Sequence, residues 1–240
     1  MDLPFTVMRP LSGITIPQIK ELHPKISAQY PGSKERRKWE GKFEFKDDKS
    51  LAHSFDLGVD GYLFESSDKL QIVQFRLDGF TFSRLRPYQT WESLRDEAQR
   101  LWGIYKESVN PIGASRLAVR YINQLDVALP ANANEYFTKP PQTSSDASSG
   151  IESFFSRMVV NHPEGISSIV IQAFEKPENS VTTRLLLDID VFKLTTLKID
   201  DRKTWEIEER KIWEAFELLR QIKNKIFFSS ITSKTKEICQ

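Results

Sequence analysis

Two aspartates near position 190 have the residue type and the spacing that metal binding or hydrolysis would need. Asp188 and Asp190 occupy alternate positions of an apolar run that is predicted to be a strand, so both side chains point to one face. Paired carboxylates on one face can hold a divalent metal ion. Arg184 shares that face, and a ladder of charges stabilised by cross-strand pairs explains the same pattern. The sequence thus leaves a metal-dependent hydrolase and a structural charge ladder open, and it favours the ladder.

A second group combines arginine and tyrosine side chains on strands that are expected to be neighbours. Arginine binds phosphate or carboxylate through two parallel hydrogen bonds, and tyrosine stacks on nucleobases. The residues of this ligand or nucleic-acid site would be Arg76, Arg84, Arg86, Tyr88, Arg116, Arg120 and Tyr121. Ion pairing with nearby carboxylates is the alternative, and the near-zero net charge favours it. Those carboxylates are Glu92, Asp96, Glu97 and Asp126.

Other catalytic machinery is sparse in the sequence. It contains no Walker-type phosphate loop, no GxGxxG motif, no GxSxG elbow and no HExxH motif. His23, His53 and His162 are scattered over a helix, a loop and a turn, which favours structural or solvent roles. The single cysteine, Cys239, has no partner for an intrachain disulfide. We therefore expect no cofactor, and the sequence favours a non-catalytic protein over an enzyme.

Composition bears on the partners and the compartment. The 240 residues include 34 basic and 33 acidic side chains, for a net charge of +1, so no overall field points to nucleic acid or to a membrane surface. No stretch approaches the roughly 20 apolar residues of a membrane span, and the first residues lack the pattern of a secretory leader. With its lone cysteine, the chain is expected in the cytoplasm.

Periodicity predicts the elements of the first half. Apolar residues at helical spacing indicate a helix over 15–30 that Pro24 kinks or splits, and a short strand is expected near 4–8. Strict alternation predicts a strand over 39–45, after a polar run over 32–38. A strand near 62–65 and one long strand over 70–85, bent at Gly79, follow. Thr90 is expected to cap a helix that covers this sheet.

The second half shows a similar succession. A strand is predicted over 116–129, then a polar loop over 130–150, and then strands near 155–161, 166–174 and 181–192. A long helix follows with a terminal helix from Thr232. The apolar face of the long helix is Trp205, Ile212, Trp213, Phe216, Leu219, Ile222 and Ile226.

The repeated order predicts an α+β protein of two related halves. Each half would be a mainly antiparallel sheet covered by a long helix, in a β-α-β-β-β-α-like duplication. Short residue matches accompany the order, since Leu77-Asp78 and Thr90-Trp91 in one half resemble Leu187-Asp188 and Thr204-Trp205 in the other. The halves would span 1–112 and 113–240, and one continuous domain is the alternative.

Several segments resemble an uncharacterised bacterial protein family that is sporadically distributed among genomes. The resemblance rests on GFTFSRLRPYQTW, RYIN, LLLDIDVF and KNKIFFSSITSKTKE, and it covers most of the chain. It implies no reaction or cofactor. A sporadic distribution implies horizontal movement, and hence a role beside mobile elements, such as antiviral defence or a toxin-associated system.

Three functional hypotheses follow. The first is a non-catalytic binding or sensor protein that binds a protein partner or itself, as in a homodimer. Exposed side chains among Phe80, Phe82, Phe227 and Phe228 would mark its surface. The alternatives are a nucleic-acid-binding module that uses the arginines and a hydrolase that uses Asp188 and Asp190.

Overall fold

The chain folds into two compact α+β units, each with an antiparallel sheet and a long helix. The computed structural model describes residues 2–8, 14–46, 49–85, 87, 90–128, 132–142, 151–175, 181–198 and 202–238. Asp2–Ser115 and Thr196–Asp200 form the first unit, and Arg116–Thr195 and Asp201–Gln240 form the second. The α+β class with two antiparallel halves is as the sequence predicts.

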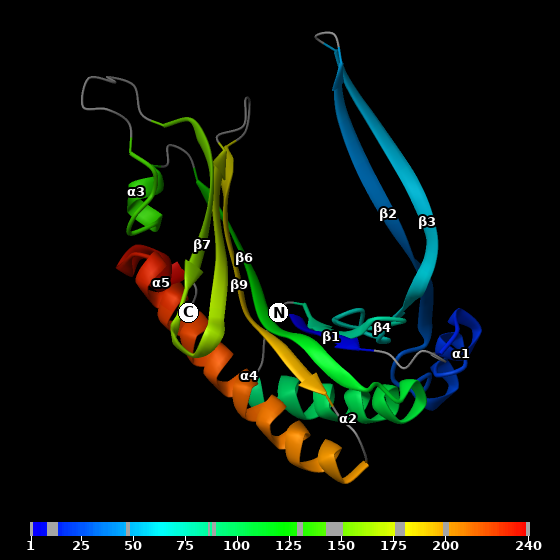
Figure 1. Ribbon diagram of the computed structural model, residues 1–240. Helices are drawn as coiled ribbons and strands as arrows, with labels where there is room; N and C mark the ends of the chain where they lie inside the picture. Colours follow the sequence, from blue (N-terminus) through cyan, green and yellow to red (C-terminus); the bar gives the residue numbers. More distant parts are fainter. Residues whose placement is uncertain are drawn as a thin grey trace. The chain divides into compact units, whose positions relative to one another are not determined.

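The first unit carries a sheet in the order β2-β3-β4-β5-β1, and the α2 helix packs on it (Figure 1). Its elements are β1 (Asp2–Met8), α1 (Ile16–Lys20), the 3₁₀ turn η1 (His23–Lys25), β2 (Gly32–Lys46), β3 (Lys49–Glu65), β4 (Gln71–Arg76), β5 (Gly79–Arg84) and α2 (Trp91–Val109).

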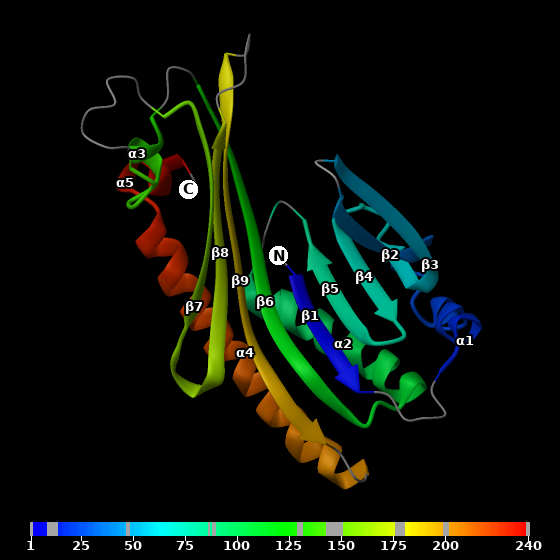
Figure 2. The ribbon, with the colours of Figure 1, turned by 45° about the horizontal axis from the view of Figure 1, so that its top comes forward.

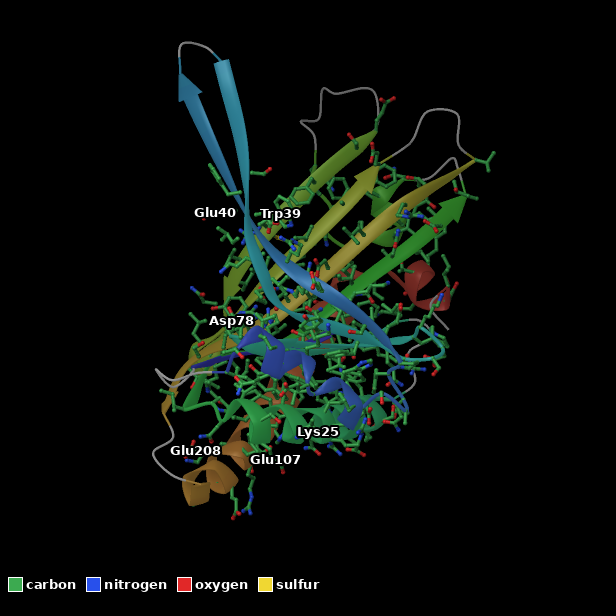
Figure 3. All side chains as sticks on the ribbon, turned by 90° about the vertical axis from the view of Figure 1, so that its right-hand side faces the viewer. Lys25, Trp39, Glu40, Asp78, Glu107 and Glu208 are labelled. Atoms are coloured by element: carbon green, nitrogen blue, oxygen red, sulfur yellow. The ribbon has the colours of Figure 1, made fainter. Side chains whose placement is uncertain are left out.

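One prediction for the first unit is wrong, and one strand is longer than predicted. The single strand expected over 70–85 is a hairpin, because the chain turns at Leu77-Asp78 and Arg76 pairs with Gly79. The strand predicted over 39–45 begins earlier, at Gly32, because ion pairs to β3 stabilise the charged side chains of the polar run over 32–38. Arg36 pairs with Asp60 there, and Lys34 lies 3.7 Å from Glu65. Figure 3 shows Trp39 and Glu40 farther along this β2-β3 hairpin.

An aromatic cluster between α2 and β3 to β5 forms the core of the first unit. The ring of Phe80 lies 5.9 Å from that of Trp102, and Phe75 lies 5.7 Å from Tyr105. All four side chains are buried. The Thr90 side chain accepts a hydrogen bond from the Ser93 N–H, so it caps α2 as predicted.

The second unit repeats this plan with a sheet in the order β6-β9-β8-β7. Figure 2 shows the four strands side by side, with α4 along one face. Its elements are β6 (Gly113–Ala128), α3 (Ala133–Tyr136), β7 (Ser153–Asn161), the 3₁₀ turn η2 (Pro163–Gly165), β8 (Ile166–Glu175), β9 (Thr182–Lys198), α4 (Arg202–Ser230) and α5 (Ser233–Ile238).

Apolar side chains of β9 and α4 form the core of the second unit. Leu187, Ile189 and Val191 alternate with the charged residues of β9 and therefore point to the opposite face of the sheet. They are buried, as are Ile212 and Phe216 of α4. The short α3 lies within the segment that was predicted to be loop. It packs on α5, where the Thr235 hydroxyl donates to the Tyr136 carbonyl at 2.8 Å.

The two units share the pairing order of four strands, with β2 as an extra strand in the first, but the short residue matches do not correspond. In each unit the first strand lies beside the last, and the three last strands are consecutive neighbours. Leu77-Asp78 is a turn, however, whereas Leu187-Asp188 lies inside β9. Thr90 caps α2, whereas Thr204 lies inside α4. The order of elements therefore supports duplication, and the residue matches do not.

Removing a core aromatic should destabilise the protein far more than removing an exposed one. Trp102→Ala should lower the free energy of unfolding by about 3–5 kcal/mol, because the fully buried indole leaves a cavity. Trp39, on β2 of the same unit, is 61% exposed, so Trp39→Ala serves as the matched control. Urea denaturation followed by circular dichroism measures both, and equal losses would contradict this core.

Candidate functional site

Arginine and aspartate side chains alternate across β6 and β9 of the second unit. Arg120 Nη2 lies 2.6 Å from Asp188 Oδ2, with a second bond from Nε to Oδ1 at 3.0 Å. Arg116 Nη2 lies 2.8 Å from Asp190 Oδ2, and Arg184 Nε lies 2.8 Å from Asp126 Oδ1. We call these three pairs the ion-pair ladder. They include both predicted carboxylates and two of the predicted arginines.

The strand register places the ladder on the sheet face opposite α4. Asp188 pairs with Ile171 of β8, which pairs with Arg157 of β7. Residues paired in this way lie on the same face. The register likewise links Asp190, Ile169 and Val159. We call this surface the open face, and its members include Arg116, Arg120, Ile122, Phe155, Arg157, Val159, Ile169, Ile171, Asp188, Asp190 and Leu194.

Asp190 is the less well solvated member of its pair. Burial raises the pKa of the Asp190 carboxyl, although the Arg116 guanidinium opposes this shift. Asp190 Oδ1 is buried without a hydrogen-bond partner in the described part of the chain. The Arg116 guanidinium also lies 4.7 Å from the centre of the Phe192 ring, in a cation–π contact.

Asp188 and Asp190 thus have the geometry of the charge-ladder interpretation. Both point to one face, as the alternation predicted, and each accepts a hydrogen bond from an arginine. In the described ranges, no three His, Cys, Asp or Glu side chains gather as they would around a metal ion. Asp126 pairs with Arg184, which is outside the predicted arginine and tyrosine group, whereas Arg116 and Arg120 of that group pair with Asp190 and Asp188.

The structure separates the remaining members of the arginine and tyrosine group. Arg76 and Arg84 belong to the first unit and lie at opposite ends of the β4-β5 hairpin, since Arg84 pairs with Gln71. Burial lowers the pKa of Arg76, whose Nε is 3.8 Å from Asp78 Oδ1. Tyr121 lies on the α4 side of its sheet. Arg86 and Tyr88 are outside the described residues.

Lys223 on α4 is a site residue that the sequence patterns did not reveal. It is 5% exposed, and its Nζ lies 3.4 Å from the centre of the Tyr121 ring. Burial lowers the pKa of the Lys223 amine to about 8, and the charge of Arg220 adds to this effect. The only sequence signal was a lysine next to the apolar helix position Ile222.

A polar cluster in the first unit lines an open hollow of about 430 Å³. The Tyr30 hydroxyl lies 2.7 Å from Glu97 Oε1 and 2.6 Å from Gln71 Oε1. Its single proton goes to the carboxylate, which is the stronger acceptor. Burial, together with the Glu97 carboxylate, raises the pKa of Tyr30. Arg100 donates to both oxygens of Glu97, at 2.7 Å to Oε1 and 2.8 Å to Oε2, so hydrogen bonds within the cluster hold it together.

Exposed apolar side chains occur on both units, with Trp39, Phe55 and Leu57 on β2 and β3 of the first and a further group on the second. Phe80 and Phe82, which were candidates for a partner surface, are buried in the first core, whereas Phe228 on α4 is exposed. On the open face, Phe155 is 68% exposed and Val159 is 56% exposed, and Ile122 and Leu194 are exposed as well. The sequence missed this surface because its strands alternate like any half-buried strand.

Comparison with protein-family models, with curated proteins and with solved structures finds no match for the chain. Among the helices that the structure describes, none combines the length and the apolar character needed to cross a membrane.

The Arg120–Asp188 pair should contribute more to the free energy of unfolding than the more exposed Arg184–Asp126 pair. Arg120→Met leaves Asp188, whose side chain is 8% exposed, without its guanidinium and should cost about 2–3 kcal/mol of unfolding free energy. Arg184→Met is the control, because that pair is largely exposed and should change stability little. Urea titrations at low and high salt measure both. Equal effects of the two substitutions would contradict this ranking.

Lys223 should make the free energy of unfolding depend on pH in the alkaline range. Its pKa falls from 10.5 when unfolded to about 8 when folded, so between these values the unfolded state binds more protons and stability rises with pH. The wild type should gain about 3 kcal/mol relative to Lys223→Met from pH 8 to 10.5, and the difference should be flat below pH 8. Lys225→Met, on the exposed side of α4, controls for the lost charge. A pH-independent difference would refute the burial effect.

Proposed function

We propose that this chain is a non-catalytic binding protein that docks a protein partner on the open face of its second sheet. The observation that carries the proposal is the composition of that face. Exposed apolar side chains on β6, β7 and β9 surround ion pairs that are already formed. Apolar patches rimmed by polar groups are typical of protein-binding surfaces.

The ion-pair ladder supports a protein partner over nucleic acid. Arg116 and Arg120 each hold an aspartate of the neighbouring strand, so a phosphate would have to compete with a carboxylate at hydrogen-bond distance. Of the other predicted arginines, Arg76 and Arg84 are described, and they lie at opposite ends of the β4-β5 hairpin of the first unit. A phosphate-binding surface usually presents arginines that cluster on one face.

The same ladder supports a binding role over hydrolysis at Asp188 and Asp190. A carboxylate that ligates a metal offers its oxygen lone pairs to the ion, whereas Asp188 accepts two hydrogen bonds from Arg120. We place the protein in the bacterial cytoplasm, from its single cysteine and the family resemblance. That resemblance also makes a defence or toxin-associated system the setting that we propose.

Aspartates placed on the open face should remove the partner. Ile122→Asp with Leu194→Asp puts charges on exposed positions of β6 and β9, and burying them at an interface would cost too much for binding to persist. Phe228→Asp on α4 is the matched control, because it alters an exposed apolar residue away from this face. Native mass spectrometry of the tagged protein from its own cells should show a partner at fixed ratio for the wild type and the control only.

The contradicting outcomes are equally specific. A partner that is retained by the double variant would place binding elsewhere. Circular dichroism establishes that the double variant is folded. A wild type that carries no protein partner, or that turns over a substrate through Asp188 and Asp190, would refute the proposal.

A further inference from the structure

The outer edge of β7 presents unpaired main-chain groups at known positions. The His162 N–H donates to the Ile166 carbonyl at 2.8 Å, and this bond fixes the phase of the β7-β8 ladder. In an antiparallel pair, hydrogen-bonded residues alternate with residues whose main-chain groups point away from the partner strand. The register therefore directs the N–H and C=O groups of Phe155, Arg157 and Val159 outward. No strand of the described chain pairs with this edge.

This edge lacks the protection that the chain gives to β2, at the end of the first sheet. Nine of the 15 residues of β2 are charged, and charged edge strands resist pairing with other chains. In the nine residues of β7, Arg157 is the only charged one. Phe155 and Val159 flank it on the same face and are exposed. The β7 edge is therefore suited to accept a strand.

Arg157 indicates the chemistry of the strand that would be accepted. Its side chain is exposed and forms no ion pair with a residue of the described chain. The register aligns Arg157 with Ile171 and Asp188 across the sheet, and Asp188 already forms an ion pair with Arg120. An added strand would place one of its side chains directly opposite Arg157, where a carboxylate stabilises and a cation destabilises the pair.

A second copy of this chain fits the edge poorly. Two β7 strands that pair antiparallel over their full length are centred on Arg157, so the two guanidinium groups would lie opposite each other. A register shift that separates them also shortens the paired region. The single charge thus disfavours self-association and selects a strand of another kind.

We propose that the β7 edge binds an extended segment of the partner by strand addition, with the pattern apolar–x–acidic–x–apolar. Main-chain hydrogen bonds to Phe155, Arg157 and Val159 would supply affinity, and the carboxylate opposite Arg157 would supply specificity. Alternate positions carry the pattern because side chains alternate along a strand. This inference rests on the proposed function, and it specifies that the partner contributes an extended segment that pairs with β7 of the second sheet.

A fluorescent peptide of alternating valine and threonine with a central glutamate serves as the probe, and the same peptide with a central lysine is its control. The glutamate peptide should bind the full-length protein about tenfold more tightly, as measured by fluorescence anisotropy. Arg157→Glu should reverse this preference. Failure of both peptides to bind, or equal affinity for the two, would overturn the inference.

Proline tests the main-chain bonds directly. Val159→Pro removes one outward N–H without breaking a bond to β8 and should weaken the glutamate peptide about tenfold, whereas Val159→Thr keeps the N–H and the branched side chain. Circular dichroism and urea titration check that both variants fold. Unchanged affinity in a folded Val159→Pro protein would overturn strand addition.

The cellular partner separates this inference from the proposed function. If the partner is lost with Ile122→Asp and Leu194→Asp but retained with Val159→Pro, the open face binds it without the β7 edge, and only the inference fails. If both variants retain the partner, the proposed function fails. Native mass spectrometry that shows a dimer dissociated by Val159→Pro would make a second copy the occupant and would overturn the inference.

Discussion

The second sheet is wider than the α4 helix that covers it, and the exposed strand and the ion pairs of this sheet follow from the mismatch. A helix is about 10 Å across, and neighbouring strands are about 4.8 Å apart, so one helix cannot cover four strands. The central strands β8 and β9 bury their apolar side chains beneath α4. At the end of the sheet, Met158 and Val160 of β7 remain exposed even on the α4 side. The exposed strand and the open face are consequences of covering this sheet with one long helix on one side.

An uncovered sheet face needs another source of stability, and in the second unit the ion-pair ladder provides it. Cross-strand pairs of opposite charge join β6 to β9 where an apolar row would have exposed a larger hydrophobic surface. Burial around Asp188 and Asp190 makes these pairs sensitive to the loss of either partner. The carboxylates that look most like a reactive site in the sequence are therefore explained by the needs of the sheet.

The end strands of the two sheets differ in how they resist pairing with other chains, and β2 has no counterpart in the second sheet. The β2 strand carries dense charge and pairs it across to β3, through Arg36 with Asp60 and Arg37 with Asp56. The β7 strand carries one charge among apolar residues. The side chains of the end strand therefore decide whether a sheet edge is protected or open.

The sequence by itself determined the α+β class, the order of most elements and the helix cap at Thr90, because periodicity and capping are local properties. It also placed Asp188 and Asp190 on one face, since strand alternation is fixed by the backbone. It merged β4 and β5 into one strand, because Gly79 suits a bend within a strand as well as a turn, although the Asp78-Gly79 dipeptide is a common hairpin signal.

Only the tertiary structure decided which charges meet and which strand lies at the edge. Arg120 finds Asp188, 68 residues later, through the pairing of β6 with β9, which no local pattern encodes. The outward direction of the Val159 N–H depends on the phase of its ladder with β8, and the burial of Lys223 depends on the packing of α4. Contacts between residues far apart in the sequence determine these features, and the local spacing of residues does not specify which distant residues will pair.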